Sequence, residues 1–548
     1  MDKSSRYVFR STEALGSGAF TLSTYRSTQT GFWAKAGIMA AVVAMAVFFG
    51  LTIGYLPLNL IILPLLPIVL LTLLIIWIMP ENRNPPTKFM AVMFFAYVVA
   101  VVAWPYYLAI QVPGLPLIEI RRAFAALALF GFLVCFSTST NFRNDLRNIC
   151  AASPYEMKLF WVFLIFQTLA VPASVDIVGS IGNYVKYQIG WTAVFFIAAY
   201  VMTKPGNMAR FSKTMIYLAV FLALLAFAES RNQGILWANH IPSFLKVSDP
   251  AMKNLLEPVF REGAYRVTGP FSTSLSYAEF MTMALPFFIH YIVEGKNLWL
   301  RALVIICEIA VMLAIYLTHA RVGIVGILSS HGAYFVAWTL RKWSQDRNNI
   351  MASLILFGMP VAMLLSVATV LSVPALRIAT LGGGAQSAST NGRLEQMEAA
   401  IPLILKRPII GYGPGEGAGV LNYRNPAGEL SIDSYILAGA LNYGLVGFLV
   451  MAAMYGFFVL KGIRAGQEGS GEISIAVPAA TGIAVWMVAK IVLAQEDNMS
   501  VVYMLMGVVL AAVYRVQQEK APALARSPRS EPGLRERFKA RWRRAVTG

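Results

Sequence analysis

Apolar stretches of membrane-spanning length follow one another along almost the whole chain, and only short polar connections separate most of them. Residues 36–54, 89–110 and 350–373 are examples that reach or approach the roughly 20 residues needed to cross the hydrocarbon core of a bilayer. Lipid offers the backbone no hydrogen-bond partners, so stretches of this kind have to be helical. The sequence therefore predicts an all-α polytopic membrane protein.

Length and hydropathy together predict about fourteen such spans. The chain has 57% apolar and only 13% charged residues over 548 positions, a composition that excludes a soluble protein with a single core. The predicted spans are 36–54, 57–79, 89–110, 121–137, 158–177, 187–203, 213–229, 276–294, 299–317, 321–340, 350–373, 433–460, 473–494 and 498–515.

Lysine and arginine are concentrated in alternate connections, for example at 83–88, 143–158 and 341–347. Connections of this kind face the cytoplasm in most membrane proteins. An even number of spans places both the N-terminal tail, 1–35, and the basic C-terminal tail, 516–548, on that side. The net charge of +18 then reflects topology and contact with anionic lipid, not nucleic-acid binding.

Two connections are much longer than the rest, at 230–275 and 374–432, and both fall on the opposite, outer side. Loops of this length are usually functional or disordered, and the apolar and aromatic residues of these two predict order. In the second loop, Asn391 is the predicted N-cap of a helix that Pro402 kinks and Pro408 ends. We therefore expect the functional site on the outer, periplasmic side.

A glycine-rich segment follows that helix, from Gly411 to Gly419. Glycines allow a backbone to approach a ligand closely, so Gly411, Tyr412 and Gly413 are candidates for a cradle around phosphate or sugar. The alternative is a structural loop that returns the chain to the membrane. The segment is not a nucleotide-binding loop, because no Gly-Lys-Ser/Thr follows and because it faces away from cytoplasmic ATP.

Several basic residues also lie on the outer side. Arg266 precedes the span at 276–294, and Arg321 stands at the turn into the span at 321–340. A guanidinium binds phosphate through two parallel hydrogen bonds and keeps its charge at any working pH, so this group predicts a dianionic ligand. For each arginine taken alone, a side chain that only reaches toward lipid headgroups is the alternative. The other members are Arg393, Lys406, Arg407 and Arg424.

These residues occur in an order that resembles a known family. The segments are Arg266-x-x-Gly269-x-Phe271, Thr318-x-x-Arg321, Asn391-Gly392-Arg393, Pro408-Ile409-Ile410-Gly411-Tyr412-Gly413, Asp433-Ser434-Tyr435 and Gly444-Leu445-Val446-Gly447. Over roughly residues 260–460, their order and spacing are similar to those of the bacterial O-antigen ligase and O-antigen polymerase superfamily.

The resemblance implies an inner-membrane glycosyltransferase of the GT-C type, which takes a glycan from an undecaprenyl diphosphate carrier at the periplasmic face. It implies that Arg321 holds the diphosphate, that Arg266 is a second contact, and that Arg393 is a third contact or a brace for its loop. The glycine-rich segment and Arg424 are then expected to contact the diphosphate or the glycan. Membrane lipid and a polysaccharide chain-length regulator are further expected partners.

Under this interpretation the chain has three membrane regions between its two tails. Residues 36–229 form a transmembrane scaffold, 230–460 form the catalytic region, and 461–515 form C-terminal transmembrane helices. Arg121 and Arg122, at the outward start of the fourth span, guide lipid phosphate or act as interfacial anchors.

The expected chemistry is a metal-independent transfer with no cofactor. Outer arginines stabilise the charge that grows on the departing diphosphate, and no acidic pair or histidine cluster stands at metal-ligand spacing outside. Asp433 is the candidate base for the acceptor proton, with Glu416 and Glu429 behind it, and an N-cap is its alternative role. His319 is a further candidate for the base or for orienting the diphosphate, unless it is structural.

Two departures from the ligase pattern favour a polymerase that joins lipid-linked repeat units into a surface polysaccharide, O-antigen or exopolysaccharide. Ligases have a histidine where this chain has Asp433, and usually an acidic residue where it has Asn442. Transfer of finished chains to lipid A core by a ligase is the alternative. A flippase or other transporter is expected to carry midplane charges in two related halves, whereas mid-span charges here are few, mainly Glu308 and Lys490.

Overall fold

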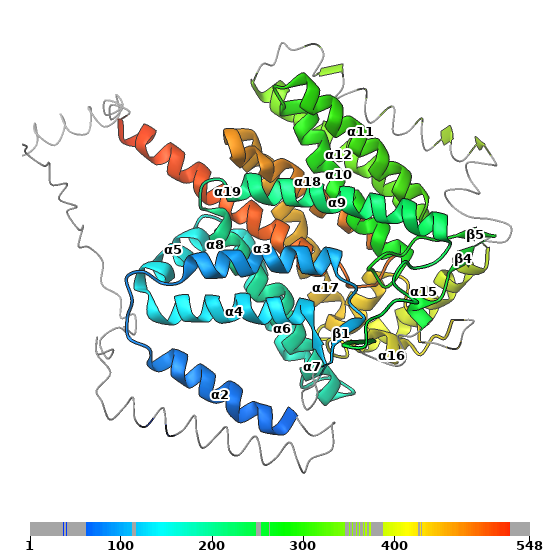
Figure 1. Cartoon of the computed structure of the whole chain (residues 1–548), viewed down its shortest axis with the longest axis horizontal. Helices are drawn as coiled ribbons and strands as arrows, with labels where there is room; N and C mark the ends of the chain where they lie inside the picture. The colour runs from blue at the N-terminus through cyan, green and yellow to red at the C-terminus, as the bar shows by residue number, and fades with distance from the viewer. Residues whose placement is uncertain are drawn as a thin grey trace, which may run out of the picture. The chain divides into compact units, whose positions relative to one another are not determined.

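The computed structural model describes residues 62–111, 117–247, 254–261, 263–345, 387–425, 428 and 430–526, together with isolated positions at 37, 40 and within 350–373. The fold is mostly helical (Figure 1). By its internal contacts the chain falls into two units, a smaller one of residues 1–85 and 137–140 and a larger one of residues 86–136 and 141–548.

The elements have the following bounds. The helices are α2 (Ile62–Ile78), α3 (Thr87–Ala103), α4 (Ile120–Thr138), α5 (Thr140–Ala151), α6 (Pro154–Ala170), α7 (Ile177–Tyr187), the π-helix η3 (Gln188–Ala193), α8 (Val194–Met202), α9 (Asn207–Asn232), α10 (Ser274–Glu294), α11 (Leu298–Tyr316), α12 (Arg321–Gln345), α15 (Ser387–Lys406), α16 (Gly417–Leu421), α17 (Tyr435–Glu468), the 3₁₀-helix η6 (Gly471–Ile475), α18 (Ala476–Ala489) and α19 (Met499–Arg526). The strands are β1 (Leu108–Ile110), β2 (Ile118–Glu119), β3 (Leu245–Val247), β4 (Phe260–Arg261) and β5 (Ala264–Tyr265).

Eight helical segments of the described residues are long and apolar enough to cross a membrane, or nine if the bent pair α5 and α6 forms one span. These segments confirm the prediction of a polytopic helical membrane protein. The predicted count of fourteen is not reached within the described part of the chain. The predicted spans at 36–54 and 350–373 lie outside it apart from isolated positions, while α2 and α3 are shorter apolar helices. The polar residues of α10 also keep it from being one of the eight, although it is buried along most of its length.

The smaller unit contains α2 and the residues that follow it. The hydroxyl of Ser137 donates to the carbonyl of Ile76 (2.7 Å), and the backbone N–H of Asn82 donates to the carbonyl of Thr138 (2.6 Å). Apolar side chains such as Trp77 are exposed along α2, as expected of a helix that faces lipid.

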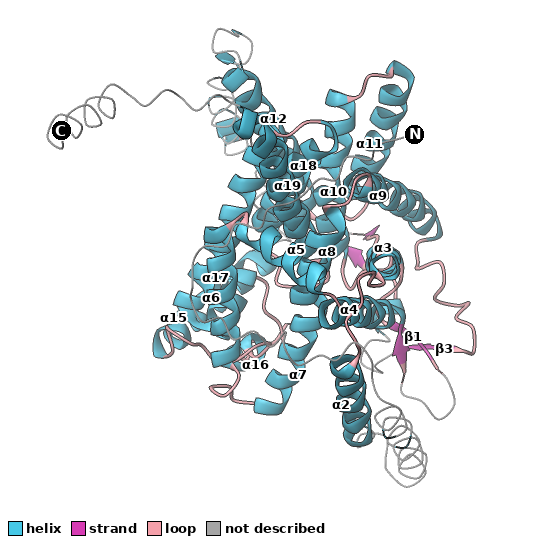
Figure 2. Ribbon diagram, turned by 90° about the vertical axis from the view of Figure 1, so that its left-hand side faces the viewer, coloured by secondary structure: helices cyan, strands magenta, loops and turns pink. Residues whose placement is uncertain are grey.

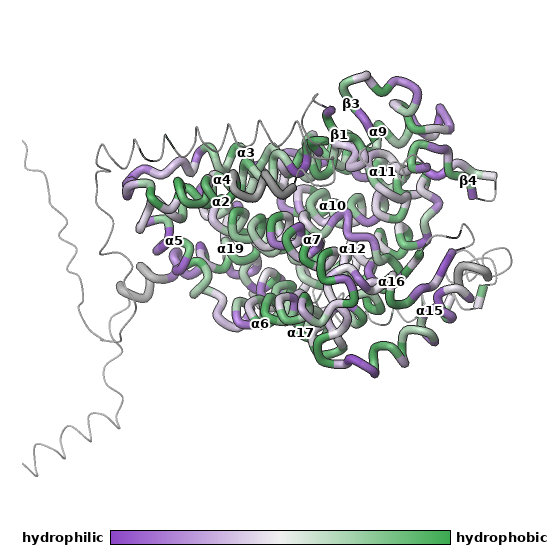
Figure 3. The backbone as a smooth tube through the Cα atoms, turned by 90° about the horizontal axis from the view of Figure 1, so that it is seen from below, coloured by the Kyte–Doolittle hydropathy of each residue, from purple (hydrophilic) through white to green (hydrophobic). Residues whose placement is uncertain are grey.

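In the larger unit, α10, α18 and the first half of α19 are buried along most of their length. Glycines allow these helices to approach their neighbours closely, as is common in membranes. A Cβ placed on Gly507 of α19 would lie only 2.6 Å from the Cβ of Ala198 in α8, and one on Gly462 of α17 only 2.8 Å from the Cβ of Ala480 in α18. Hydrophobic residues run through this bundle, and hydrophilic stretches include α5 and α15 (Figure 3).

In the larger unit, salt bridges and hydrogen bonds connect neighbouring helices at one end of the bundle. Glu472, in η6 just before α18, pairs with Arg515 of α19 (2.7 Å) and accepts from the N–H of Gly206, which precedes α9 (2.9 Å). Arg341 near the end of α12 pairs with Glu294 at the end of α10 (2.9 Å). The first long loop joins the other ends of α9 and α10, and β4, β5 and α15 lie at that end (Figure 1). Arg341 and Arg515 thus lie at the opposite end of the bundle from this loop, and which end faces the cytoplasm stays a prediction.

The third predicted span, 89–110, is too long at its C-terminal end. Helix α3 stops at Ala103, and Pro105 follows, after which the chain forms β1. This strand pairs antiparallel with β2 and with β3 (Figure 2), so the first long loop is attached to the end of α3. A short three-stranded sheet thus replaces the last turns of the expected helix.

The sixth predicted span, 187–203, starts too late. The helical segment begins at Ile177, where the Asp176 side chain caps it by accepting from the N–H of Gly179 (3.1 Å). It continues through η3 into α8 without interruption. Polar residues in its first turns, among them Asn183, concealed this start from a hydropathy search.

Helix α15 confirms that the second long loop contains a helix, but the predicted cap at Asn391 is wrong, because the helix already begins at Ser387. It continues through Pro402 and ends at Lys406, two residues before Pro408. Ser434, and not Asp433, is the N-cap residue of α17, and its side chain makes no capping hydrogen bond.

Helix α17 is broken at Gly444, which sequence analysis treated as part of one straight span. Gly444 has φ 75° and ψ 167°, a conformation open to glycine and costly for other residues. The segment before the glycine-rich stretch fits into this break, because the N–H of Val446 donates to the carbonyl of Pro408 (3.1 Å). A Cβ on Gly444 would lie 2.6 Å from the carbonyl carbon of Ile409.

We predict that Gly444→Ala lowers the free energy of unfolding by about 2 kcal/mol or more, because the new Cβ both clashes and disfavours the required φ. The measurement is the thermal unfolding midpoint of the purified protein in detergent. Gly456→Ala is the matched control, since Gly456 lies in the same helix with open space around its Cβ position, and its midpoint should stay equal or rise. Equal midpoints for Gly444→Ala and the parent protein would contradict the role of the break.

Candidate active site

Arg266 contacts the tight turn that Arg321 follows in the chain. This turn joins α11 to α12. The side-chain Nε of Arg266 donates to the carbonyl of Thr318 (3.0 Å), and the next N–H, of Val267, donates to the carbonyl of Leu317 (3.3 Å). Arg321 is the first residue of α12, three positions after Thr318. The structure thus brings these two predicted ligand-binding residues together.

Arg266 has a spare donor at this turn. Its guanidinium is half-buried, and its Nη2 is buried without a hydrogen-bond partner among the described residues. Burial, together with the neighbouring charge of Arg261, lowers the pKa of the Arg266 guanidinium to about 10. The group therefore stays cationic at neutral pH and would gain from an anionic partner.

The turn itself is held by Thr318 and includes His319. The buried Thr318 hydroxyl donates to the carbonyl of Ile315 (2.6 Å) and accepts from the N–H of Ala320 (3.2 Å). His319 is half-buried and adopts a left-handed φ of 46°, which is rare outside glycine. Helix α12 begins directly after this turn, and the N-terminal end of a helix favours negative charge.

Glu229 fixes the segment that carries Arg266, and sequence analysis missed it as a site residue. This carboxylate is buried at the end of α9 and accepts from the hydroxyl of Tyr265 (2.7 Å) and from the N–H groups of Thr268 (2.9 Å) and Gly269 (3.0 Å). These donors stand on both sides of Arg266 in the chain. An acidic residue near the end of an apolar span was the only signal in the sequence.

Asp433 and Arg393 form a second group, at the start of α17. Their side chains approach to 3.6 Å, and each is about one-third exposed. The N–H of Asp433 donates to the side-chain oxygen of Gln396 (2.8 Å), and Ser431 donates to the Asp433 carboxylate (3.3 Å). The predicted brace role of Arg393 fits this contact, since it joins α15 to the entry of α17.

The amides of the glycine-rich segment bond to the broken helix α17. The N–H of Tyr412 donates to the carbonyl of Leu441 (2.8 Å), and the N–H of Gly413 donates to the carbonyl of Asn442 (3.0 Å). The side chain of Asn442 accepts from the N–H of Gly417 (2.7 Å). A ligand at this segment would therefore need other donors, and the alternative of a structural loop accounts for these contacts.

The remaining predicted ligand contacts have ordinary structural partners. Tyr412 is buried, donates its hydroxyl to the carbonyl of Leu403 (3.0 Å) and has the guanidinium of Arg407 over its ring at 4.7 Å. Gly411 has φ 75° and packs against the break in α17. Arg424 is exposed and donates to the carbonyl of Gly428 (2.6 Å).

Residues 303–452 match the family model described as O-antigen ligase. Over these 150 of the 548 residues the chain is similar to that family, and we call this segment the O-antigen ligase domain. The domain begins within α11, contains Arg321, α15, the glycine-rich segment and Asp433, and ends within α17. The resemblance seen in the sequence is confirmed over these residues. No curated protein matches the chain.

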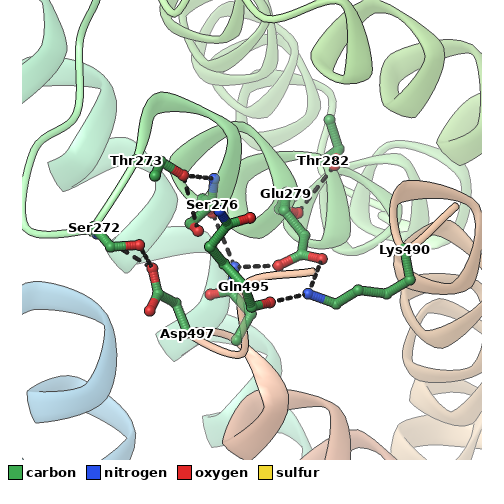
Figure 4. Close-up of polar contacts among 9 residues, drawn as sticks. Ser272, Thr273, Ser276, Glu279, Thr282, Lys490, Gln495 and Asp497 are labelled. Carbon is green, nitrogen blue, oxygen red and sulfur yellow. Dashed lines mark hydrogen bonds and ion pairs between the residues drawn. The ribbon is translucent and has the colours of Figure 1, made fainter. Parts of the chain in front are cut away.

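A buried polar cluster joins the O-antigen ligase domain to the helices that follow it (Figure 4). Lys490 pairs with Glu279 of α10 (2.9 Å) and also donates to the carbonyl of Gln495, while the Asn498 side chain donates to the other oxygen of Glu279 (2.8 Å). The N–H of Tyr435, the first residue of α17, donates to the carbonyl of Lys490 (3.1 Å). Sequence analysis placed Lys490 inside a span, but it follows the end of α18 and is the only predicted member of this cluster.

Three other residues noted in the sequence have partners among the described residues. Arg122 pairs with Glu119 (2.9 Å), and the Arg121 guanidinium lies over the ring of Tyr106 at 5.0 Å. Glu308, within the O-antigen ligase domain, faces His331 across α11 and α12 (3.4 Å). Glu429 lies outside the described residues.

We predict that Glu229→Ala lowers the free energy of unfolding by roughly 2 kcal/mol, because it leaves two backbone N–H groups and one hydroxyl without their buried acceptor. Thermal unfolding in detergent measures the effect. Glu398→Ala is the control, because Glu398 is exposed on α15, and its midpoint should equal that of the parent protein. A midpoint for Glu229→Ala that also equals the parent value is the outcome that contradicts this role.

Proposed function

We propose that this protein is an inner-membrane glycosyltransferase that polymerises undecaprenyl-diphosphate-linked repeat units into a surface polysaccharide at the periplasmic face. The observation that carries the proposal is the hydrogen bond from the Arg266 guanidinium to the turn at Thr318, three residues before Arg321 begins α12. A guanidinium held beside the N-terminal end of a helix whose first residue is also an arginine suits a diphosphate.

The expected reaction follows from this arrangement. No nucleotide sugar is available outside the cytoplasm, so the donor brings its own leaving group, and a lipid diphosphate supplies it. Negative charge grows on the diphosphate as the bond to the anomeric carbon breaks. Arginines fixed by the chain stabilise that charge more in the transition state than in the ground state, which is what accelerates the step. In this scheme they take the place that a divalent metal holds elsewhere.

The preference for a polymerase depends on Asp433 and Asn442, which stand where ligases have other residues. Asn442 has no acidic group and accepts from the N–H of Gly417, and the Asp433 carboxylate pairs with Arg393, so neither residue matches what the ligase pattern has at its position. A ligase that transfers finished chains to lipid A core is the second candidate, since the O-antigen ligase domain is compatible with both. A chain-length regulator is an expected partner of the polymerase alone.

We predict that Arg321→Ala reduces polysaccharide formation by at least about 10²-fold, because the mutant loses a charge aimed at the leaving group. The measurement is surface polysaccharide in a deletion strain that carries the variant, with the protein level checked by immunoblot. Arg231→Ala is the control, since Arg231 is exposed at the end of α9 on the same side of the membrane bundle. Normal polysaccharide in Arg321→Ala at normal protein level would exclude the diphosphate role.

A further inference from the structure

The connection between α18 and α19 carries a carboxylate that the site described above does not use. Glu496 accepts from the hydroxyl of Tyr187 through Oε1 (3.1 Å), which is the one hydrogen bond that its carboxylate makes with the described residues. The side chain is half-buried. Its two neighbours in the chain, Gln495 and Asp497, are anchored, as Figure 4 shows, so Glu496 is held on an ordered loop.

Five other carboxylates among the described residues near this end of the bundle have partners. Glu229 and Glu279 are buried and fully used in holding other groups. Asp497 accepts from both the N–H and the hydroxyl of Ser272. Asp433 pairs with Arg393. Glu416 accepts from Ser180 of α7 (3.4 Å), on the segment that closes the break in α17.

The loop that holds Glu496 is close to the turn of the two arginines. A Cβ on Gly323, two residues after Arg321, would lie 3.4 Å from the Cβ of Ala278 in α10. The next residue of α10, Glu279, binds Lys490 and Asn498, which stand at the two ends of the loop. Helices in such contact have axes about 8–10 Å apart, so α10 links the first turn of α12 to this loop.

A second set of contacts also places the loop that holds Glu496 near Arg266. Ser272 binds Asp497 and follows Arg266 by only six residues in the chain. Even a fully extended segment of this length spans no more than about 20 Å. A glycan bound through its diphosphate at the arginines would thus reach the loop with its first sugars.

We propose that Glu496 is the base that takes the proton of the acceptor hydroxyl, a role that rests on the proposed glycosyl transfer. The acceptor oxygen forms a bond to the anomeric carbon and gives its proton to Oε2 of Glu496. The bond between that carbon and the diphosphate oxygen breaks, and the diphosphate leaves with the electron pair toward the arginines. Water then removes the proton from Glu496.

The surroundings of Glu496 suit this role. Burial raises the pKa of Glu496, and the charges of Lys186 and Lys490 with the hydrogen bond from Tyr187 oppose that shift. A carboxylate with a raised pKa is a stronger base, and it works only when the pH is above that pKa. The titratable groups that face it are Lys186, Tyr187, Tyr435, Tyr443, Lys490, Asp497 and Tyr503.

The test is the pH dependence of kcat for the purified full-length protein, with donor and acceptor units extracted as undecaprenyl-diphosphate-linked oligosaccharide from a deletion strain. We expect Glu496→Gln to lose about 10²- to 10⁴-fold in kcat and to lose the acid limb of the profile. Glu496→Asp should keep part of the rate and the limb. Tyr187→Phe should shift the limb to higher pH, because it removes a hydrogen bond that favours the charged carboxylate.

Asp433→Asn is the matched control, and it should keep the acid limb whatever its rate. If Glu496→Gln is folded by size-exclusion chromatography and keeps the parent rate and limb while Arg321→Ala is inactive, Glu496 is not the base and the proposed function stands. If Arg321→Ala is active as well, the proposed function itself fails. A limb that disappears in Asp433→Asn would assign the base to Asp433 instead.

Discussion

Backbone carbonyls at the outer ends of the helices have no partner within their own helix, and the arrangement of the site depends on how the chain satisfies them. In a bilayer such groups are too costly to leave unpaired. Leu317 and Thr318, at the end of α11, receive Val267 and Arg266 from the first long loop. Leu441 and Asn442, at the break in α17, receive the N–H groups of Tyr412 and Gly413 from the second. Each long loop is thus bound to a helix end by the same requirement.

The buried carboxylates of this region also attach loops to helices. A carboxylate inside a protein is stable only when it is paired or hydrogen-bonded, and Glu229 meets that condition entirely with donors of the loop that carries Arg266. Glu279 meets it with Lys490 and Asn498, which fixes the connection between α18 and α19. These acids therefore position other groups. Arg266, with a buried nitrogen left over, and Glu496, whose carboxylate makes one hydrogen bond with the described residues, keep capacity for a ligand.

Hydropathy was enough to predict the class and most helices, because partition into lipid depends on the local sequence. The spans predicted at 121–137, 213–229 and 299–317 match α4, α9 and α11 to within a few residues, apart from the longer ends of α9. The early end of α3 and the break at Gly444 depend instead on partners far away in the chain, namely β3 and residues 408–412. No local pattern contains that information.

The residues of the candidate site could also be predicted only in part. Motif order predicted the O-antigen ligase resemblance, with Arg266 and Arg321 as site candidates, while the hydrogen bond from Arg266 to Thr318 became visible only in three dimensions. Glu229 and Glu279 were missed because a single acid in or beside an apolar span has no signature until its partners are known. The glycine-rich segment was the strongest local signal, yet two of its amides bond to α17.

The most direct test of the account is the pool of glycans on undecaprenyl diphosphate in a strain that lacks this gene, measured by mass spectrometry. The account predicts that single repeat units accumulate, and that the parent protein clears them. Long lipid-linked chains in the deletion strain would show a ligase instead of a polymerase. A pool identical to that of the parent strain would contradict glycosyl transfer from the lipid carrier altogether.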